Sequence, residues 1–284
     1  MKNHDRGKLF ELFVGLNLCK QLTFNRASNP HEYIDNMYSQ YSSEVDTVKS
    51  YATISSNKLK SQFKIDECYW TSYGKSDFVS FDLPDAGCSD LVIKSDNKYI
   101  GLSLKLTNTG NITLSSFGIE SISSSIGFNP ESLFSIKYKM DEELSNNSYG
   151  NNMEERKRWY KTTKNKVVSS IGISYRHQMR DLIHDNLSSK SKHSIDGHIR
   201  NVYNINSEVP LYTVGYNIKT SSVNISNNKE ILENKIKSID KYNISSNGTY
   251  IWIDTNHSKF IHHNIKFQNT PFSAINFNTR KTRS

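Results

Sequence analysis

The sequence predicts an α/β protein with a mixed central β-sheet flanked by helices, followed by a C-terminal α+β portion. Three observations support this class. Residues 7–22 have the apolar pattern of a helix, residues 90–106 alternate like a β-hairpin, and a long helical region over 153–187 precedes further strand patterns. Of the 284 residues, 35% are hydrophobic, which is enough to build a sizeable core.

The helix expected over 7–22 is apolar around most of its circumference. Glu11 is its only acid, and it lies between Gly7 and Gly15 on one stripe at four-residue spacing. An unpaired carboxylate among apolar side chains is costly. We therefore expect Glu11 either to form an ion pair with a lysine or to belong to a functional site.

The alternation over residues 90–106 predicts two antiparallel strands with one buried face. A two-residue turn at 96–97 closes the hairpin and sets its register. In that register Asp90 faces Ser103, and Lys105 is the diagonal neighbour of Asp90. The pattern therefore predicts an acid, a hydroxyl and a lysine on the same face.

The remaining elements are predicted from shorter patterns. Residues 63–94 look rich in strands, including 77–81, and a short helix over 115–126 contains Glu120. Further strands are expected at 210–219, 249–254, 259–267 and 272–278. Trp252 is expected in the core rather than as a platform for nucleic-acid bases. The histidines lack metal-binding spacing and are expected at the surface or in the core.

An Asn- and Ser-rich stretch at 144–152 predicts a flexible loop. It divides the chain into residues 1–143, which contain the hairpin, and residues 144–284, which contain the later helices and strands. We expect the second portion to complete the fold.

The composition indicates which class of binding partner and which cellular compartment to expect. The formal net charge is +8, which suits a nucleic-acid partner but is also common in other proteins. Three scattered cysteines show no zinc-binding spacing, so a reduced, cytoplasmic setting is expected. No apolar run approaches the roughly 20 residues that a membrane-spanning helix requires.

The hairpin carries the residue types that phosphodiester hydrolysis needs. A divalent metal lowers the pKa of a water, and a nearby cation stabilises the developing negative charge. At this point the chain resembles the PD-(D/E)xK nucleases, the restriction-endonuclease-like superfamily. Asp90 matches the first acid of their motif, Lys105 the lysine, and Glu11 the glutamate often found on an early helix.

One position departs from that motif, because Ser103 stands where an acid is expected. Restriction enzymes that cut around CCGG cores are similar in carrying Ser-x-Lys, and they recruit a glutamate from the following helix. Glu120 lies 17 residues after Ser103, close to the spacing in that group. The resemblance therefore implies that Glu120 replaces the missing carboxylate.

The resemblance implies a restriction-endonuclease-like core and a Mg²⁺-dependent DNA endonuclease of a restriction, mobile-element or phage system. Asp90 would bind the metal with Glu120 or the Leu104 carbonyl, and Lys105 would position or activate the attacking water. Glu11 would support that metal or bind a second one.

The partners implied are double-stranded DNA and a second copy of the chain, with residues 144–284 providing DNA recognition or dimerisation. The alternative is a decayed nuclease that binds DNA without cutting it.

Overall fold

The predicted hairpin lies at the centre of a six-stranded sheet in the computed structural model, which describes residues 1–25, 29–71, 75–108, 113–255 and 259–281. It consists of β3 (Leu91–Ser95) and β4 (Lys98–Thr107). Asp96 and Asn97 form the turn with φ values of 48° and 62°. Leu91 pairs with Leu102 and Ser95 with Lys98, which confirms the predicted register.

The six-stranded sheet is mixed. Its order is β1-β2-β3-β4-β6-β7, where β1 is Leu22–Thr23, β2 is Ile65–Trp70, β6 is Leu211–Asn217 and β7 is Ser222–Asn227. Strand β4 is antiparallel to β3 and parallel to β6, and β1 is parallel to β2. The chain is therefore an α/β protein with a mixed central sheet flanked by helices, as the sequence predicts.

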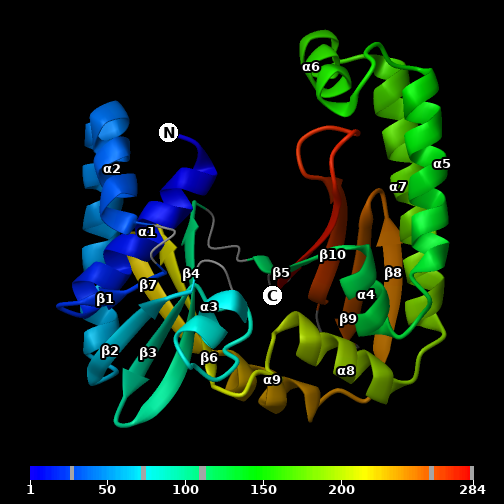
Figure 1. Cartoon of the computed structure of the whole chain (residues 1–284). Coiled ribbons are helices and arrows are strands. Elements are labelled where there is room, and N and C mark those ends of the chain that lie inside the picture. The colour runs from blue at the N-terminus through cyan, green and yellow to red at the C-terminus, as the bar shows by residue number, and fades with distance from the viewer. Residues whose placement is uncertain (26–28, 72–74, 109–112, 256–258, 282–284) are drawn as a thin grey trace. The chain divides into compact units, whose positions relative to one another are not determined.

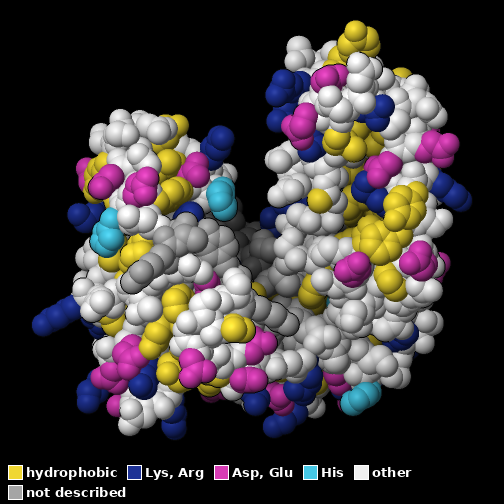
Figure 2. Space-filling model, in the orientation of Figure 1, with side chains coloured by type: hydrophobic (Ala, Val, Ile, Leu, Met, Phe, Trp, Pro, Cys, Tyr) yellow, Lys and Arg dark blue, Asp and Glu magenta, His cyan; other side chains and the backbone are white. Residues whose placement is uncertain are grey.

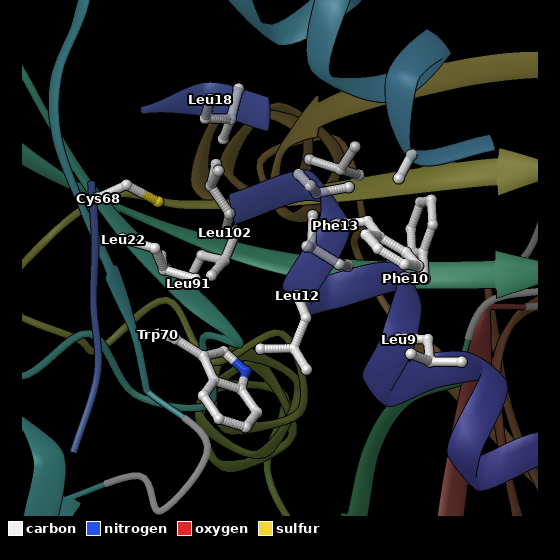
Figure 3. Packing of buried hydrophobic residues seen from close by; sticks show 14 of the residues in the cluster. Leu9, Phe10, Leu12, Phe13, Leu18, Leu22, Cys68, Trp70, Leu91 and Leu102 are labelled. Carbon is white, nitrogen blue, oxygen red and sulfur yellow. The ribbon is translucent and has the colours of Figure 1, made fainter. Parts of the chain in front are cut away.

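Two long helices cover one face of this sheet, as Figure 1 shows. They are α1 (Asn3–Leu18) and α2 (Pro30–Lys60), whereas the shorter α3 (Lys75–Ser80) packs on the opposite face. Figure 3 shows Leu22, Leu91 and Leu102 packed beside α1, with Trp70 facing Leu12. The helix expected over 7–22 thus exists but begins and ends four residues earlier.

Gly15 allows α1 to approach the sheet closely. A Cβ atom at this position would lie 2.9 Å from Cδ1 of Leu22 and 3.3 Å from Cδ2 of Leu91. Since 2.9 Å is shorter than real carbon–carbon contacts, a larger residue would push the helix outward or force Leu22 to move. Gly15 therefore sets the distance between α1, which carries Glu11, and the hairpin, whereas a Cβ atom at Gly7 would meet no atom within 4 Å.

The chain divides into two compact units. Unit 1 comprises Met1–Ile112 and Tyr203–Lys235, and unit 2 comprises Thr113–Val202 and Ile236–Ser284. The division expected from the sequence after residue 143 falls inside a helix of unit 2. The first three residues of the loop expected at 144–152 belong instead to that helix, which ends at Asn146, and residues 147–152 connect it to the helix that begins at Met153.

Unit 2 has its own antiparallel sheet in the order β5-β11-β10-β9-β8. Its strands are β5 (Thr113–Phe117), β8 (Tyr242–Asn247), β9 (Tyr250–Thr255), β10 (Lys259–Phe267) and β11 (Ile275–Lys281). Its helices are α4 (Ile119–Ile126), α5 (Glu131–Asn146), α6 (Met153–Thr163), α7 (Lys166–Ser188) and α8 (Lys192–Val202). A further helix, α9 (Asn228–Ile236), lies at the point where the chain passes from unit 1 back to unit 2. Figure 1 shows α5 and α7 on the same side of β8, β9 and β10. In the part of the chain that is described, no helix is long and apolar enough to cross a membrane.

Two local expectations were wrong. Residues 77–81 were expected in a strand, but most of them lie in α3, where Phe78 is buried and Val79 is 83% exposed. A short apolar run does not distinguish a strand from one turn of helix. The segment expected as a helix over 115–126 begins with β5, and α4 starts only after Gly118.

Trp252 is not a core residue. It is partly exposed, whereas its neighbours Ile251 and Ile253 are completely buried. Alternate side chains of a strand point to opposite faces, so the burial of the two isoleucines places Trp252 on the other face of the sheet. The expectation failed because either of the two alternating sets could have formed the core.

A chain of hydrogen bonds crosses the core of unit 2. Nε2 of His198 on α8 lies 2.9 Å from Nε2 of His263 on β10. The other ring nitrogens contact Ser125 Oγ at 2.7 Å and Thr279 Oγ1 at 2.6 Å. Both rings are almost completely buried. A direct contact between the two Nε2 atoms requires one donor and one acceptor, so at least one imidazole must be neutral.

This pair makes the stability of the protein sensitive to acid. Burial lowers the pKa of His198 to about 4 and holds the pKa of His263 well below its usual value. In the unfolded chain both would titrate near pH ~6.5, so below that pH the unfolded state binds more protons and stability falls. Urea unfolding should show a loss on the order of 2–4 kcal/mol between pH 7 and pH 5.

The double variant His198→Asn/His263→Asn should be less stable at pH 7 but should show a flatter pH dependence over this interval. An unchanged slope in the double variant would mean that other groups cause the acid sensitivity.

Candidate active site

Asp90 lies at the start of the hairpin, where its backbone is held from both sides. Its N–H donates to the Leu102 carbonyl at 2.8 Å, and its carbonyl accepts from the Thr71 N–H at 3.1 Å. The preceding turn depends on Gly87, which has a φ of +63° and would place a Cβ atom 1.7 Å from Nδ2 of Asn204. Only glycine fits that position without rearrangement.

One oxygen of the Asp90 carboxylate accepts three hydrogen bonds. Oδ2 receives the backbone N–H of Leu104 at 2.6 Å, the Lys105 ammonium at 3.1 Å and, more weakly, the Ser103 hydroxyl at 3.4 Å. Within the described ranges, Oδ1 accepts no hydrogen bond. The predicted face of acid, hydroxyl and lysine is therefore formed, and one carboxylate oxygen remains available for a ligand.

Lys105 stays positively charged in this setting. Burial alone would lower its pKa, but the negative charge of Asp90, the hydrogen bond to it and the nearby Glu11 together raise the pKa above its usual value. A lysine with a raised pKa is a poor proton acceptor at neutral pH. Its chemical role is therefore that of a fixed cation.

Glu11 reaches the same place from α1. Burial and the neighbouring Asp90 carboxylate raise the pKa of Glu11 to about 8, against a smaller opposing effect of Lys105. The buried indole N–H of Trp70 makes no hydrogen bond with the described residues, yet it lies close enough to favour the charged form of Glu11. Figure 3 shows the nitrogen of Trp70 on the side of its ring that faces α1.

Glu11, Asp90 and Lys105 line one cleft of about 780 Å³, formed entirely within unit 1. Lys8 and Trp70 also line it. The Lys8 ammonium lies over two aromatic rings, 4.5 Å from the centroid of Tyr33 and 5.2 Å from that of Trp70. The cleft thus contains two carboxylates and two cations beside the indole ring of Trp70.

Sequence reasoning missed Lys8 and Trp70 as members of this site. Lys8 precedes Glu11 by three residues, a spacing that places both on one face of a helix, so it was detectable once Glu11 had been singled out. Trp70 gave no such signal, because a tryptophan in a strand is ordinarily part of the core.

The other proposed ligands lie elsewhere or have other contacts. Glu120 is exposed on α4, which belongs to unit 2, whereas Glu11, Asp90 and Lys105 belong to unit 1. Leu104 lines the cleft, while its side chain is buried in the core. Ser103 is buried and donates only its long hydrogen bond to Asp90 among the described residues.

The residues present fit a magnesium ion better than a metal that needs many protein ligands. Over the described part of the sequence, no three His, Cys, Asp or Glu side chains are placed to bind one metal together. Magnesium is commonly bound by one or two carboxylates and keeps several waters. Glu11 and the free Oδ1 of Asp90 meet that requirement, and a bound cation would offset both the burial and the repulsion by Asp90 that raise the pKa of Glu11.

Comparisons with known proteins give little further information. No family model matches the chain, and no curated protein is significantly similar to it. A solved structure of the restriction endonuclease MspI in complex with its cognate DNA is similar over 96% of this chain and 97% of that one, at 12% identity and a TM-score of 0.33. Because similarity at this level does not identify a site, the functional assignment depends on the residues of the cleft.

The raised pKa of Glu11, caused first by burial and then by the Asp90 carboxylate, predicts a pH-dependent gain in stability for Glu11→Gln. The folded pKa of about 8 lies above the ordinary value of 4.5, so the folded state binds more protons between these values and its stability falls as the pH rises. Without added metal, the stability of Glu11→Gln relative to wild type should increase by about 4 kcal/mol from pH 5 to pH 8.5.

Urea unfolding at both pH values measures this change, with Glu32→Gln on the exposed side of α2 as the matched control. If Glu11→Gln and Glu32→Gln show the same pH dependence of stability, the pKa of Glu11 is not raised in the folded protein.

Proposed function

We propose that this protein is a Mg²⁺-dependent DNA endonuclease of a restriction, mobile-element or phage system, built on a restriction-endonuclease-like core. The observation that carries the proposal is the convergence of Glu11, Asp90 and Lys105 in one cleft. These residues are far apart in the sequence, and they supply the two acids and the cation that metal-assisted phosphodiester hydrolysis requires.

Each side chain has a distinct role in this mechanism. Asp90 would hold the metal with the carboxylate oxygen that accepts no hydrogen bond, and the hydrogen bonds that Oδ2 accepts from the Leu104 N–H and the Lys105 ammonium fix the orientation of the carboxylate. Glu11 provides the second carboxylate, either to the same ion or to a second one. A bound magnesium ion supplies a more acidic water and a counter-charge for the scissile phosphate.

Lys105 places its charge where negative charge develops. Since its raised pKa keeps it protonated, it orients the attacking water or stabilises the phosphate rather than removing a proton. Its salt bridge with Asp90, 3.1 Å long, leaves its side chain 33% exposed and accessible from the cleft.

The missing acid at Ser103 leaves one coordination position to be filled. Glu120 is the proposed replacement, by the resemblance to restriction enzymes with Ser-x-Lys, and the Leu104 carbonyl is the alternative ligand. Glu11 already brings a carboxylate into the cleft from another element, which lessens the need for a third acid.

Double-stranded DNA is the proposed substrate, in agreement with the net charge of +8. Figure 2 shows basic and acidic side chains intermixed over the visible surface, so this excess is not gathered in one large patch there. A homodimer is proposed as well, because cutting both strands of a duplex usually needs two sites. The cytoplasm is the proposed location.

A second candidate function is DNA binding without cleavage. The observation that favours it is that Ser103 replaces an acid while Asp90 is already engaged by Lys105, Leu104 and Ser103. Metal-dependent cleavage distinguishes the two functions.

Cleavage of plasmid DNA should require Mg²⁺, Asp90 and Lys105. Wild type should cut in Mg²⁺ and not in EDTA, and Asp90→Asn and Lys105→Ala should each lose more than about 100-fold in rate, since each removes a charge that acts on the reacting phosphate. Asp96→Asn and Lys98→Ala, both exposed in the same hairpin, should retain activity.

Intact plasmid over a wide range of DNAs and metals would favour the non-catalytic alternative. Cleavage by Asp90→Asn at the wild-type rate would refute the site while leaving the class of enzyme open.

The role of Glu120 can be tested separately. Glu120→Ala should lose activity to a similar extent if this carboxylate completes the metal site, whereas Glu142→Ala on α5 should not. Full activity of Glu120→Ala would assign the remaining coordination position to Leu104 or water instead.

A further inference from the structure

Among the described residues of unit 2, helices cover one face of its sheet and no helix of this unit covers the other. The covered face consists of alternate residues such as Ile251, Ile253 and Ile265, and helices α7 and α8 contact it through Phe267 and His263. The opposite face consists of the even-numbered residues within 250–254, 262–266 and 276–280, which we term the open face. Figure 1 shows helices α5 and α7 on the covered side.

The open face has an unusual composition for an uncovered sheet. It contains no aliphatic side chain, although aliphatic and aromatic residues ordinarily form the centre of a protein–protein interface. Instead it carries aromatic rings, asparagine amides and two basic residues, Lys266 and Arg280, against a single acid, Asp254. Its chemistry therefore suits an anionic, hydrogen-bonding partner.

Its aromatic residues form one continuous surface. The ring centroids of Trp252 and His262, directly paired across β9 and β10, are 4.6 Å apart. Tyr250 is 37% exposed and stacks on Trp252 at 5.8 Å with an interplanar angle of 24°. Lys259 places its ammonium 5.1 Å from the Trp252 centroid. Rings of this kind bind the flat surfaces of sugars and bases.

The amide groups beside the rings present hydrogen-bond donors. Asn264 and Asn278 are paired across β10 and β11. The carbonyl oxygen of Asn264 accepts from Thr249 at 3.1 Å and that of Asn278 from Ser116 at 2.8 Å. Neither NH₂ group donates a hydrogen bond to any of the described residues; Asn264 is partly exposed and offers its donors to a ligand directly, whereas Asn278 is only 8% exposed.

The two cations flank this centre. Arg280 pairs with His262 and Lys266 with Asn276, so the cations lie four residues apart along the strands. At the rise of a β-strand this spacing is about 13 Å. The major groove of DNA has a similar width of about 12 Å between its phosphate backbones. Neither cation forms an ion pair with any residue that the structure describes.

We propose that the open face binds duplex DNA, with Lys266 and Arg280 contacting phosphates on either side of a groove. Asn264 faces the base edges between them, and Trp252 packs against the sugar–phosphate backbone. The choice of DNA as the partner rests on the proposed endonuclease function. The structure thereby assigns to unit 2 a specific DNA-contacting surface, separate from the cleft of unit 1.

Binding of a fluorescent duplex to the full chain in EDTA tests this assignment without cleavage. The double variant Lys266→Ala/Arg280→Ala should bind about tenfold more weakly at ~0.1 M salt. The slope of log K against log salt should fall by about 2, since each phosphate contact contributes about 0.9. The matched control Lys139→Ala/Arg158→Ala changes exposed cations on α5 and α6 and should leave both values unchanged.

Two further measurements guard against a folding defect. Circular dichroism checks the fold of each variant, and if the double variant is unfolded, Lys266→Gln alone should lower the slope by about 1. Titration with duplex should also quench tryptophan fluorescence in wild type, and the quenching should be smaller in Trp252→Phe but not in Trp159→Phe, with Trp70 of the cleft contributing equally in all three proteins.

Equal affinity and salt slope in wild type and folded charge variants would overturn the inference, even if wild type cuts DNA. Conversely, if wild type never cuts DNA but the open-face variants bind it more weakly, the inference holds and the endonuclease proposal fails.

Discussion

The approach of two carboxylates, Glu11 and Asp90, is the constraint on which the site depends. Packing of α1 on the sheet, made possible by Gly15, brings Glu11 to the hairpin, and burial together with Asp90 raises its pKa to about 8. Lys105 offsets part of this repulsion through its salt bridge with Asp90. Two carboxylates held close together destabilise the folded protein, and such pairs are typical of sites that bind a cation.

The core of unit 1 explains how such an arrangement persists. Leu9, Leu12 and Val14 on α1 are completely buried, as are Leu91 and Leu102 of the hairpin. Burial of side chains of this size contributes about 1.5–3 kcal/mol each to stability. Together these contributions exceed the free-energy cost of burying the Glu11 carboxyl beside Asp90. The functional groups are therefore held by the apolar packing beneath them rather than by one another.

Much of this site could be predicted from the sequence, because its signals are local. The alternation and two-residue turn determined the hairpin register that brings Lys105 to Asp90, and the lone acid on an apolar helix marked Glu11. The place of Trp252 could not be predicted, since alternation does not say which set of residues a helix will cover. The relation of Glu120 to the site is not local either, because the two belong to different units.

The central claim is that Glu11 and Asp90 form a divalent-cation site. Titration with Mn²⁺, with free ion followed by electron paramagnetic resonance, measures this directly in wild type and in Asp90→Asn and Glu11→Gln. We expect wild type with duplex DNA to bind at least one ion per chain, and both variants to bind it more weakly by about tenfold or more, as expected when a carboxylate ligand is lost. Equal Mn²⁺ binding in all three proteins, or none in wild type, would contradict the account.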